Sequence, residues 1–319
     1  MKGIMVAGSM LVDNICEIGA YPKAGELAGI TGFSRAPGGC VPNVAADLKA
    51  LSPSVGVYAA GRVGRDEAGA FLVDFLSGLG IDVSGVIASD APTSFTEVMS
   101  VKGGQRTFFT YAGASSHFGA GDIDFDKTDV EMLHLGYLLL LDKIDAGDGE
   151  KILREAKKRG IRTSVDMVTS ADKSCEKAVL CLKYVDNLII NETEAARLAG
   201  TEEGDIVKAA YRLKELGVSE RVIIHMPEAA VCVSDSGCAK VASLDLPAGY
   251  IKGTTGAGDA FCAGALIGIY EGLDDRAMLA FASCAAAAAL GAADATSGLG
   301  NRACADIMAE KFQRRKLCL

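Results

Sequence analysis

The chain of 319 residues has no tryptophan and only three histidines, and aromatic residues make up 6% of it. The histidines are far apart and no Cys-x-x-Cys pair occurs, so the sequence shows no spacing typical of a structural zinc site. Basic residues are in the minority, with 32 Lys and Arg against 41 Asp and Glu. A nucleic-acid partner is not expected, because phosphate backbones are bound by clustered positive charge.

Long apolar runs are also missing, although half of the residues are hydrophobic. No segment is long enough to span a bilayer. The apolar stretch in Met1–Gly8 is too short for a signal peptide and is expected to contain a first strand. The ten cysteines are dispersed, mostly among apolar residues, which is typical of small core side chains in a reducing compartment. These features predict a cytoplasmic protein with no membrane partner.

Short β-branched runs alternate with amphipathic stretches along the chain. The predicted strands are Ile4–Gly8, Val55–Gly61, Met132–Gly136, Thr163–Asp166, Asn187–Ile190 and Val222–His225. The predicted helices are Val41–Leu51, Glu67–Leu79, Gly149–Arg159, Thr193–Leu198, Asp205–Leu216, Ala257–Tyr270 and Asp274–Leu290. This alternation predicts one α/β domain over residues 1–319, with a doubly wound, mainly parallel central sheet flanked by helices.

Two regions break the alternation, because each holds two strand patterns with no helix between them. The pairs are Asn14–Ile18 with Leu27–Phe33, and Thr96–Val101 with Thr107–Tyr111, the second joined by a turn at Lys102–Gln105. We expect residues of about 14–34 and 95–111 to form a small inserted antiparallel sheet, a lid that closes over a site. The alternative is an extension of the main sheet at its edge.

The tetrapeptide Gly-Ala-Gly-Asp occurs twice, and only the second copy, Gly256–Asp259, opens an apolar helix pattern. Small residues there leave backbone N–H groups uncovered at a helix start, where the dipole favours an anion. A carboxylate in that first turn can accept a proton from an alcohol, and the dipole is expected to keep Asp259 ionised. The first copy, Gly119–Asp122, lies in an acidic, non-periodic stretch and is expected to be a surface turn.

The two common nucleotide fingerprints do not apply. The chain has no G-x-x-x-x-G-K-[ST] segment, and G-x-G-x-x-G fails because Phe261 occupies the last small position after Gly256 and Gly258. A P-loop enzyme and a dinucleotide-dependent dehydrogenase are therefore disfavoured.

Four motifs in order along the chain resemble those of the PfkB, or ribokinase-like, carbohydrate kinases. They are Gly38-Gly39-Cys40-Val41-Pro42-Asn43, Gly61–Gly69, Asn191-Glu192-Thr193-Glu194 and Thr254–Phe261. Taken singly, each also fits a purely structural reading. Gly38-Gly39 could be only a turn, Asn191 only a helix cap with Glu194 as its capping-box partner, and Gly61–Gly69 only a connection. Together they extend over essentially the whole chain.

The resemblance implies a role for each matching residue. Asp259 is similar to the family's base, and Gly256, Ala257 and Gly258 to its anion hole. The same resemblance implies that Asn191 and Glu194 contact the magnesium ion and its waters, with Asp166 as a further contact through water. Substrate contacts are implied for Asp13, Gly38, Gly39 and Asn43, and nucleotide contacts for Asn191, Thr254, Gly256, Gly258 and Ser283. The glycines are expected to leave room for a ligand against the backbone, and Phe109 or Tyr111 to face the substrate.

The implied function is an ATP- and Mg²⁺-dependent kinase that phosphorylates a hydroxyl of a small sugar or sugar derivative, with a homodimer formed through the lid. Two alternatives stay open: a nucleoside kinase on the same fold, and a non-catalytic sugar-binding protein. The second is suggested by His225–Ala230, where Pro227 stands in place of the family's glycine-bearing nucleotide loop. Gly253 replaces an acidic residue associated with a monovalent cation, so potassium dependence is not implied.

Overall fold

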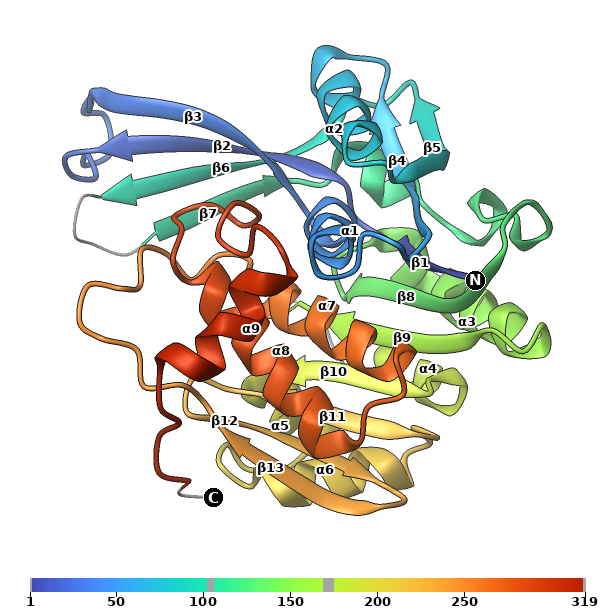
Figure 1. Cartoon of the computed structure of the whole chain (residues 1–319). Coiled ribbons are helices and arrows are strands. Elements are labelled where there is room, and N and C mark those ends of the chain that lie inside the picture. Colours follow the sequence, from blue (N-terminus) through green and yellow to red (C-terminus); the bar gives the residue numbers. More distant parts are fainter. Residues whose placement is uncertain (1, 102–105, 169–174, 318–319) are drawn as a thin grey trace.

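A computed structural model describes residues 2–101, 106–168 and 175–317 of the chain. Its main sheet has nine strands in the order β13-β12-β11-β10-β9-β8-β1-β4-β5 (Figure 1). The strands are β1 (Gly3–Ala7), β4 (Val57–Gly64), β5 (Asp82–Ser89), β8 (Val130–Leu138), β9 (Arg162–Met167), β10 (Asn187–Asn191), β11 (Arg221–His225), β12 (Ala229–Ser234) and β13 (Gly237–Ala242). Neighbouring strands from β11 to β5 run parallel, and β12 and β13 add an antiparallel edge. The doubly wound, mainly parallel sheet is confirmed.

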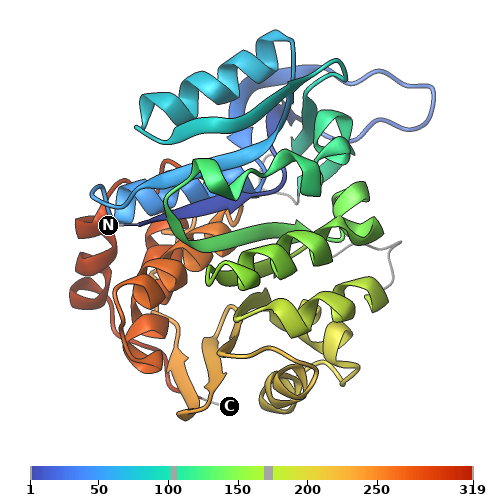
Figure 2. The ribbon, with the colours of Figure 1, turned by 90° about the vertical axis from the view of Figure 1, so that its right-hand side faces the viewer.

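Helices cover both faces of this sheet, as the two layers in Figure 2 show. One layer holds α1 (Cys40–Leu51), α2 (Glu67–Gly78), α7 (Ala257–Tyr270), α8 (Asp275–Ala289) and α9 (Arg302–Lys311). The other holds α3 (Gly149–Lys158), α4 (Glu176–Cys181), α5 (Glu192–Ala199) and α6 (Ile206–Glu215). Each layer buries its own apolar cluster against the sheet, which is why the central strands are apolar on both sides.

Small residues let α7 and α8 approach closely. A Cβ placed on Gly264 would come within 2.7 Å of the Ala282 Cα atom, so no side chain fits there. α7 also packs against α1 in the same apolar cluster. The helix that carries Asp259 is therefore held rigidly by its neighbours, and catalytic geometry benefits from such support.

The inserted strands form a second sheet of four strands, in the order β3-β2-β6-β7, apart from the main sheet (Figure 1). Its strands are β2 (Leu11–Ile18), β3 (Ile30–Gly38), β6 (Ser94–Val101) and β7 (Arg106–Tyr111). The two outer pairs are antiparallel as expected, whereas the central β2–β6 pair is parallel. β3 begins later than expected and continues to Gly38, and the turn expected at residues 102–105 lies outside the described residues.

Short helices fill several connections. They are η1 (Gly113–His117), η2 (Ala120–Asp122), η3 (Phe125–Lys127), η4 (Ile144–Asp148) and η5 (Leu182–Tyr184). The first Gly-Ala-Gly-Asp copy forms η2, and its Asp122 accepts two hydrogen bonds from Arg62, at 2.8 and 2.6 Å. The Asp122 side chain is only 8% exposed, but none of the three residues of η2 is buried as a whole, so this copy is a short surface turn as expected. Within the described ranges, none of the helices combines the length and apolar character that crossing a membrane requires.

Candidate active site

Asp259 lies in the first turn of α7, three residues after Gly256, which caps the start of this helix. Gly256 has a φ of 80°, and a Cβ at this position would clash with the Ala295 backbone, so only glycine fits. The first-turn amides of a helix have no acceptor within the helix and carry its positive dipole end. The Asp259 carboxylate therefore sits beside amides that can bind an anion, while its own residue is only 7% exposed.

Two neutral donors hold the Asp259 carboxylate. Asn43 Nδ2 on α1 donates to Oδ2 at 2.8 Å, and the Tyr137 hydroxyl donates to Oδ1 at 3.0 Å. Burial raises the Asp259 pKa to about 7, helped by the Asp166 charge and opposed by these two hydrogen bonds. The expectation that the dipole keeps Asp259 fully ionised was therefore wrong, because desolvation outweighs the dipole.

Tyr137 is a site residue that the sequence reasoning missed. It lies near the end of β8 with a φ of 60°, a conformation that residues other than glycine rarely adopt. Its backbone N–H donates to the Asp166 carboxylate, which stabilises this turn of the chain. Tyr137 is 122 residues away from Asp259 in the sequence, and no motif singles it out. Backbone strain at such a position is typical of functional sites.

The larger cavity, of about 850 Å³, opens above Asp259 between the two sheets. Of the residues predicted from the sequence, Asp13, Gly39, Asn43, Asp166, Asn191, Glu194, Gly256, Gly258 and Asp259 line it. Residues from β2, α1, β9, β10 and α7, far apart in the chain, thus meet at one place. Ligands of open α/β sheets bind at this carboxyl edge of the strands.

Asp13 is half-buried in β2, and burial raises its pKa to about 6, while the positive charge of Arg106 acts in the opposite direction. A Cβ on Gly38 would come within 2.7 Å of Asp13 Oδ2, and Gly39 has a φ of 86° with Ser9 O equally close. The packing of the protein itself thus requires glycine at position 39, whereas a side chain at position 38 would displace the side chains of Asp13 and Leu11. Gly39 lines the cavity, and the expectation that the two glycines leave room for a ligand stays a prediction.

The lid sheet supplies the wall opposite α7. Phe108, Thr110 and Thr96 line the cavity, whereas Phe109 and Tyr111 lie on the other face because side chains alternate along a strand. The expectation that Phe109 or Tyr111 faces the substrate was therefore wrong. Arg106 on β7 reaches across to donate to Thr255 Oγ1 at 2.8 Å and to the Ala293 carbonyl at 3.0 Å.

A second cavity, of about 550 Å³, lies on the other side of the α7 N-terminus. Thr254 and Ser283, both predicted to contact nucleotide, line it, together with Pro227 and Phe261. His225 also lines it, and burial lowers its pKa to about 4, so the imidazole is neutral at physiological pH. The β11–β12 connection is a tight turn in which Met226 N donates to the Ala229 carbonyl.

Gly258 separates the two cavities and lines both of them, as do Asn191 and His225. A Cβ on Gly258 would meet nothing closer than His225 Cε1 at 3.6 Å, so the packing of the protein does not require glycine here. The space above Gly258 is therefore open between the two cavities.

Asn191 and Glu194 form the capping box at the start of α5. Glu194 N donates to Asn191 Oδ1 at 2.9 Å, and Asn191 N donates to Glu194 Oε2 at 3.0 Å. The structural reading of this motif is thus correct, and both residues also line the larger cavity. Their amide and carboxylate oxygens, and those of Asp166 in the same cavity, are ligands of the type that Mg²⁺ prefers.

A model of the pfkB family of carbohydrate kinases matches residues 1–301. The chain belongs to this family. The pfkB-family kinase is 28% identical to ribokinase of Arabidopsis thaliana over 290 residues, which cover 89% of this chain and 74% of the relative. It is 31% identical to 2-dehydro-3-deoxygluconokinase of Thermoproteus tenax over 241 residues, 72% of each chain. The protein is thus a phosphotransferase with an alcohol group as acceptor.

Solved structures agree on the fold of this pfkB-family kinase. Ribokinase of Thermotoga maritima superposes with a TM-score of 0.84 at 22% identity, covering 97% of this chain and 100% of the other. Arabidopsis ribokinase complexed with ribose and ATP gives a TM-score of 0.82 at 25% identity, covering 96% and 98%. A nucleoside kinase of Methanocaldococcus jannaschii gives 0.79 at 21% identity, covering 98% and 99%, so the fold alone does not separate sugar from nucleoside kinases.

Proposed function

We propose that this kinase transfers the γ-phosphoryl group of ATP to a hydroxyl of a small sugar or sugar derivative, with Asp259 as general base. The observation that carries this proposal is the place of Asp259, which lines the larger cavity in the first turn of α7, one residue after the glycine shared by both cavities. Phosphoryl transfer needs this arrangement, because the alcohol and the nucleotide must approach one point from opposite sides.

In the larger cavity, the acceptor hydroxyl donates its proton to Asp259 as its oxygen attacks phosphorus. The amides of Gly256, Ala257 and Gly258 stabilise the negative charge on the transferred group. Asp13, with two carboxylate oxygens, accepts hydrogen bonds from other hydroxyls of the sugar. Asn43 Oδ1 is buried and has no hydrogen-bond partner among the described residues, so a substrate hydroxyl would satisfy it.

In the smaller cavity, we place the nucleotide, with its base among the apolar residues of α7 and α8. Ser283 and Thr254 lie on its walls, and Phe261 and Ala287 supply apolar surface. The ATP in the structure of Arabidopsis ribokinase supports this choice of donor. Asn191 and Glu194 would hold Mg²⁺ through its waters, with Asp166 as a further contact, and the ion would neutralise charge on the phosphates.

A sugar is favoured over a nucleoside by the curated relatives, which include ribokinase, fructokinases and 2-dehydro-3-deoxygluconokinase. Membership of a kinase family rules against the alternative of a non-catalytic binding protein, and a pKa of about 7 suits Asp259 to act as a general base. Within the same proposal, the protein is cytoplasmic and forms a homodimer through the outer face of the lid sheet.

The test is an ATP-consumption screen over sugars, sugar acids and nucleosides, followed by Asp259→Asn with the best acceptor. We expect the variant to lose about 10²–10⁴-fold in turnover, as loss of a general base does, while its ATP affinity stays within about threefold. The matched control is Asp122→Asn, which changes the same tetrapeptide away from both cavities and should lower thermal stability but not turnover. Near-normal turnover of Asp259→Asn would refute the mechanism.

A further inference from the structure

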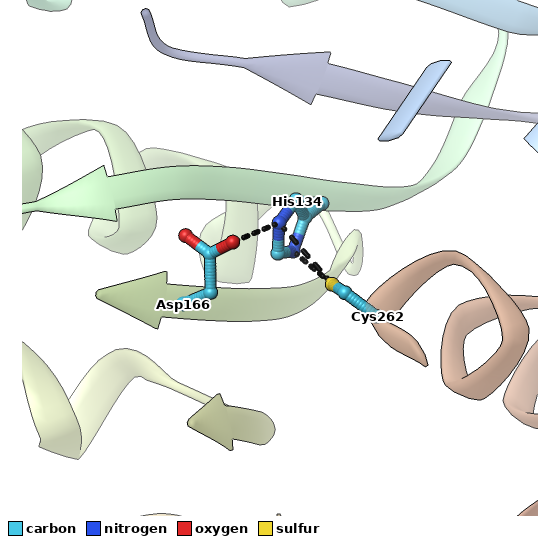
Figure 3. A group of neighbouring side chains, drawn as sticks. All are labelled: His134, Asp166 and Cys262. Atoms are coloured by element: carbon cyan, nitrogen blue, oxygen red, sulfur yellow. Dashed lines mark hydrogen bonds and ion pairs between the residues drawn. The ribbon is translucent and has the colours of Figure 1, made fainter. Parts of the chain in front are cut away.

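Below the larger cavity, His134, Asp166 and Cys262 form a compact buried group (Figure 3). They come from β8, β9 and α7, and all three are buried, with His134 inaccessible to solvent. His134 Nε2 lies 3.5 Å from Asp166 Oδ2 and 3.5 Å from Cys262 Sγ. Since 30 or more residues separate these three in the sequence, no ligand spacing could have revealed the group.

Further contacts orient the first two of these side chains. The other His134 ring nitrogen, Nδ1, lies 3.1 Å from Ser164 Oγ, and Nε2 is the nitrogen on the side of Asp166. Cys262 Sγ lies 3.9 Å from Nδ1 as well as 3.5 Å from Nε2, so the sulfur packs beside both ring nitrogens. The second carboxylate oxygen of Asp166 accepts from the Tyr137 backbone N–H, so Oδ2 remains directed at His134. Metal-binding histidines in proteins usually have such an outer partner on the nitrogen that does not bind the metal.

The separations of Asp166 and Cys262 from His134 Nε2 match those between the ligands of a tetrahedral metal ion. Bonds of about 2.0–2.3 Å at tetrahedral angles place neighbouring ligand atoms about 3.3–3.6 Å apart. Both separations measured from His134 Nε2 equal 3.5 Å, and all three ligand atoms lie within 4.8 Å of one another. To bind the same ion, Cys262 Sγ would have to move away from Nδ1, toward the outer side of Nε2 that faces Asp166.

The group is also accessible from the active site, because Asp166 and Cys262 line the larger cavity. A bound ion would have three protein ligands and a fourth position open to the cavity, the pattern of exchangeable rather than closed sites. A thiolate and an imidazole select soft or borderline cations, so Mg²⁺ would not compete for this position.

We propose that His134, Asp166 and Cys262 form a Zn²⁺ site whose occupation inhibits phosphoryl transfer. Asp259 is three residues from Cys262 and thus about one turn away on α7. An ion at the group would place its open position, with a water or a substrate hydroxyl, where the acceptor must approach the base. The inhibition rests on the proposed function, whereas binding of the ion does not.

Binding is tested on the full chain with Co²⁺ as a spectroscopic probe and Zn²⁺ as its competitor. We expect one Co²⁺ per chain, with the d–d bands of tetrahedral cobalt and a thiolate charge-transfer band, both removed by Zn²⁺. Cys262→Ser and His134→Gln should abolish these bands, and Ser164→Ala should weaken metal affinity about 10–100-fold. Cys238→Ser, which changes an exposed cysteine, is the matched control and should leave the spectrum unchanged.

Folding of each variant is checked by thermal melting, so loss of the bands is not confused with unfolding. Bands that are absent from the wild type, or that persist in both Cys262→Ser and His134→Gln, would overturn the site. In the kinase assay, Zn²⁺ should lower the wild-type turnover at least tenfold, and chelation should restore it. The turnover of Cys262→Ser should stay close to its own metal-free value when Zn²⁺ is added. Unchanged turnover with the metal bound would overturn the inhibition. If no acceptor is found, the spectra still decide the site.

Discussion

Asp259 must be ionised to accept a proton, yet its surroundings favour the protonated form. Burial and the Asp166 charge raise its pKa, and the hydrogen bonds from Asn43 and Tyr137 lower it again, which together place it at about 7. A base with this pKa is half-ionised at neutral pH and still basic enough to take a proton from an alcohol as phosphorus is attacked. The two donors thus adjust the base as well as position it.

The pKa of Asp259 predicts how the rate depends on pH. We expect kcat/KM for the acceptor to rise with pH and to reach half of its plateau near pH 7, because only the ionised carboxylate is active. Tyr137→Phe removes a donor that stabilises the carboxylate, so its midpoint should move to higher pH. The measurement is a pH–rate profile of both proteins. Identical midpoints would show that the Tyr137 hydroxyl does not act on the base.

Asp47 should make the stability of the folded protein depend on pH. It is buried in α1 with Oδ2 unpartnered among the described residues, and burial raises its pKa well above the usual range. The folded protein therefore keeps a proton that the unfolded chain loses above about pH 4. Between these two pKa values the unfolded state binds fewer protons, so the free energy of unfolding falls as the pH rises.

Asp47→Asn has the same volume and no charge to bury, so it should remove this fall. Relative to the wild type, we expect the variant to be more stable at about pH 8 than at about pH 4.5. Denaturant unfolding at both pH values measures the difference, and Asp235→Asn, at an exposed position, is the control. An equal stability difference at both pH values would contradict the prediction.

At this scale the sequence identifies residues that belong to motifs and misses those that act through distant contacts. Asp259, Asn43, Asn191 and Asp13 all lie where the motifs suggest. Tyr137 could not be found, because its role depends on a positive φ and on a partner 122 residues away. The balance of burial against the helix dipole at Asp259 also depends on packing, which a motif does not contain.

At the scale of helices and strands, the periodicity of hydrophobic residues was sufficient to predict an element where its buried faces are visible in the local sequence pattern. The strands β1, β8, β10 and β11 and the helices α1, α2, α7 and α8 were predicted to within a few residues. β5, β12, β13, α4 and α9 were missed. The parallel pairing of β2 with β6 was also missed, because register between strands about 80 residues apart is set by tertiary contacts rather than by local pattern.

Arg106 joins the lid to the loop before α7 and predicts how the lid functions. Arg106→Ala removes the hydrogen bonds to Thr255 and Ala293, so the closed lid loses stability relative to an open one. We expect KM for the acceptor to rise by about tenfold, with a smaller change in KM for ATP, because one or two hydrogen bonds to a charged group are lost.

Steady-state kinetics with each substrate varied in turn measures this effect. Arg65→Ala, which removes an arginine whose ion pair with Asp90 is exposed, is the control and should change neither KM. A rise in KM for ATP alone would show that Arg106 serves the nucleotide side rather than the lid.

At the scale of the whole molecule, the outer face of the lid sheet is unusually apolar. The register places Phe33, Phe109 and Tyr111 on the face away from the cavity, where they are 61%, 58% and 45% exposed. Hydrogen bonds from Asn14 to Glu97 and from Arg35 to Asn14 cross the same face. An apolar patch with a polar centre is typical of surfaces that bind another protein.

The proposed dimer predicts the effect of a charge on this face. Phe109→Glu should shift the protein from dimer to monomer, because a carboxylate would be buried without a partner in the interface. Sedimentation velocity over a range of concentrations measures the change. Tyr211→Glu, at an exposed position on α6, is the control and should remain dimeric. A wild-type protein that is monomeric at all concentrations would contradict the dimer.

The single glycine at position 258 between the two cavities has a further consequence for chemical design. A bisubstrate ligand, with an acceptor analogue and an adenosine joined by a short linker, could extend through the space that a side chain at this position would fill. Such a ligand would bind more tightly than either half, because binding of one half raises the effective concentration of the other. Gly258→Val should remove this gain in affinity while leaving each half to bind separately. Comparison of the linked and unlinked affinities would thus measure how open the passage between the cavities is.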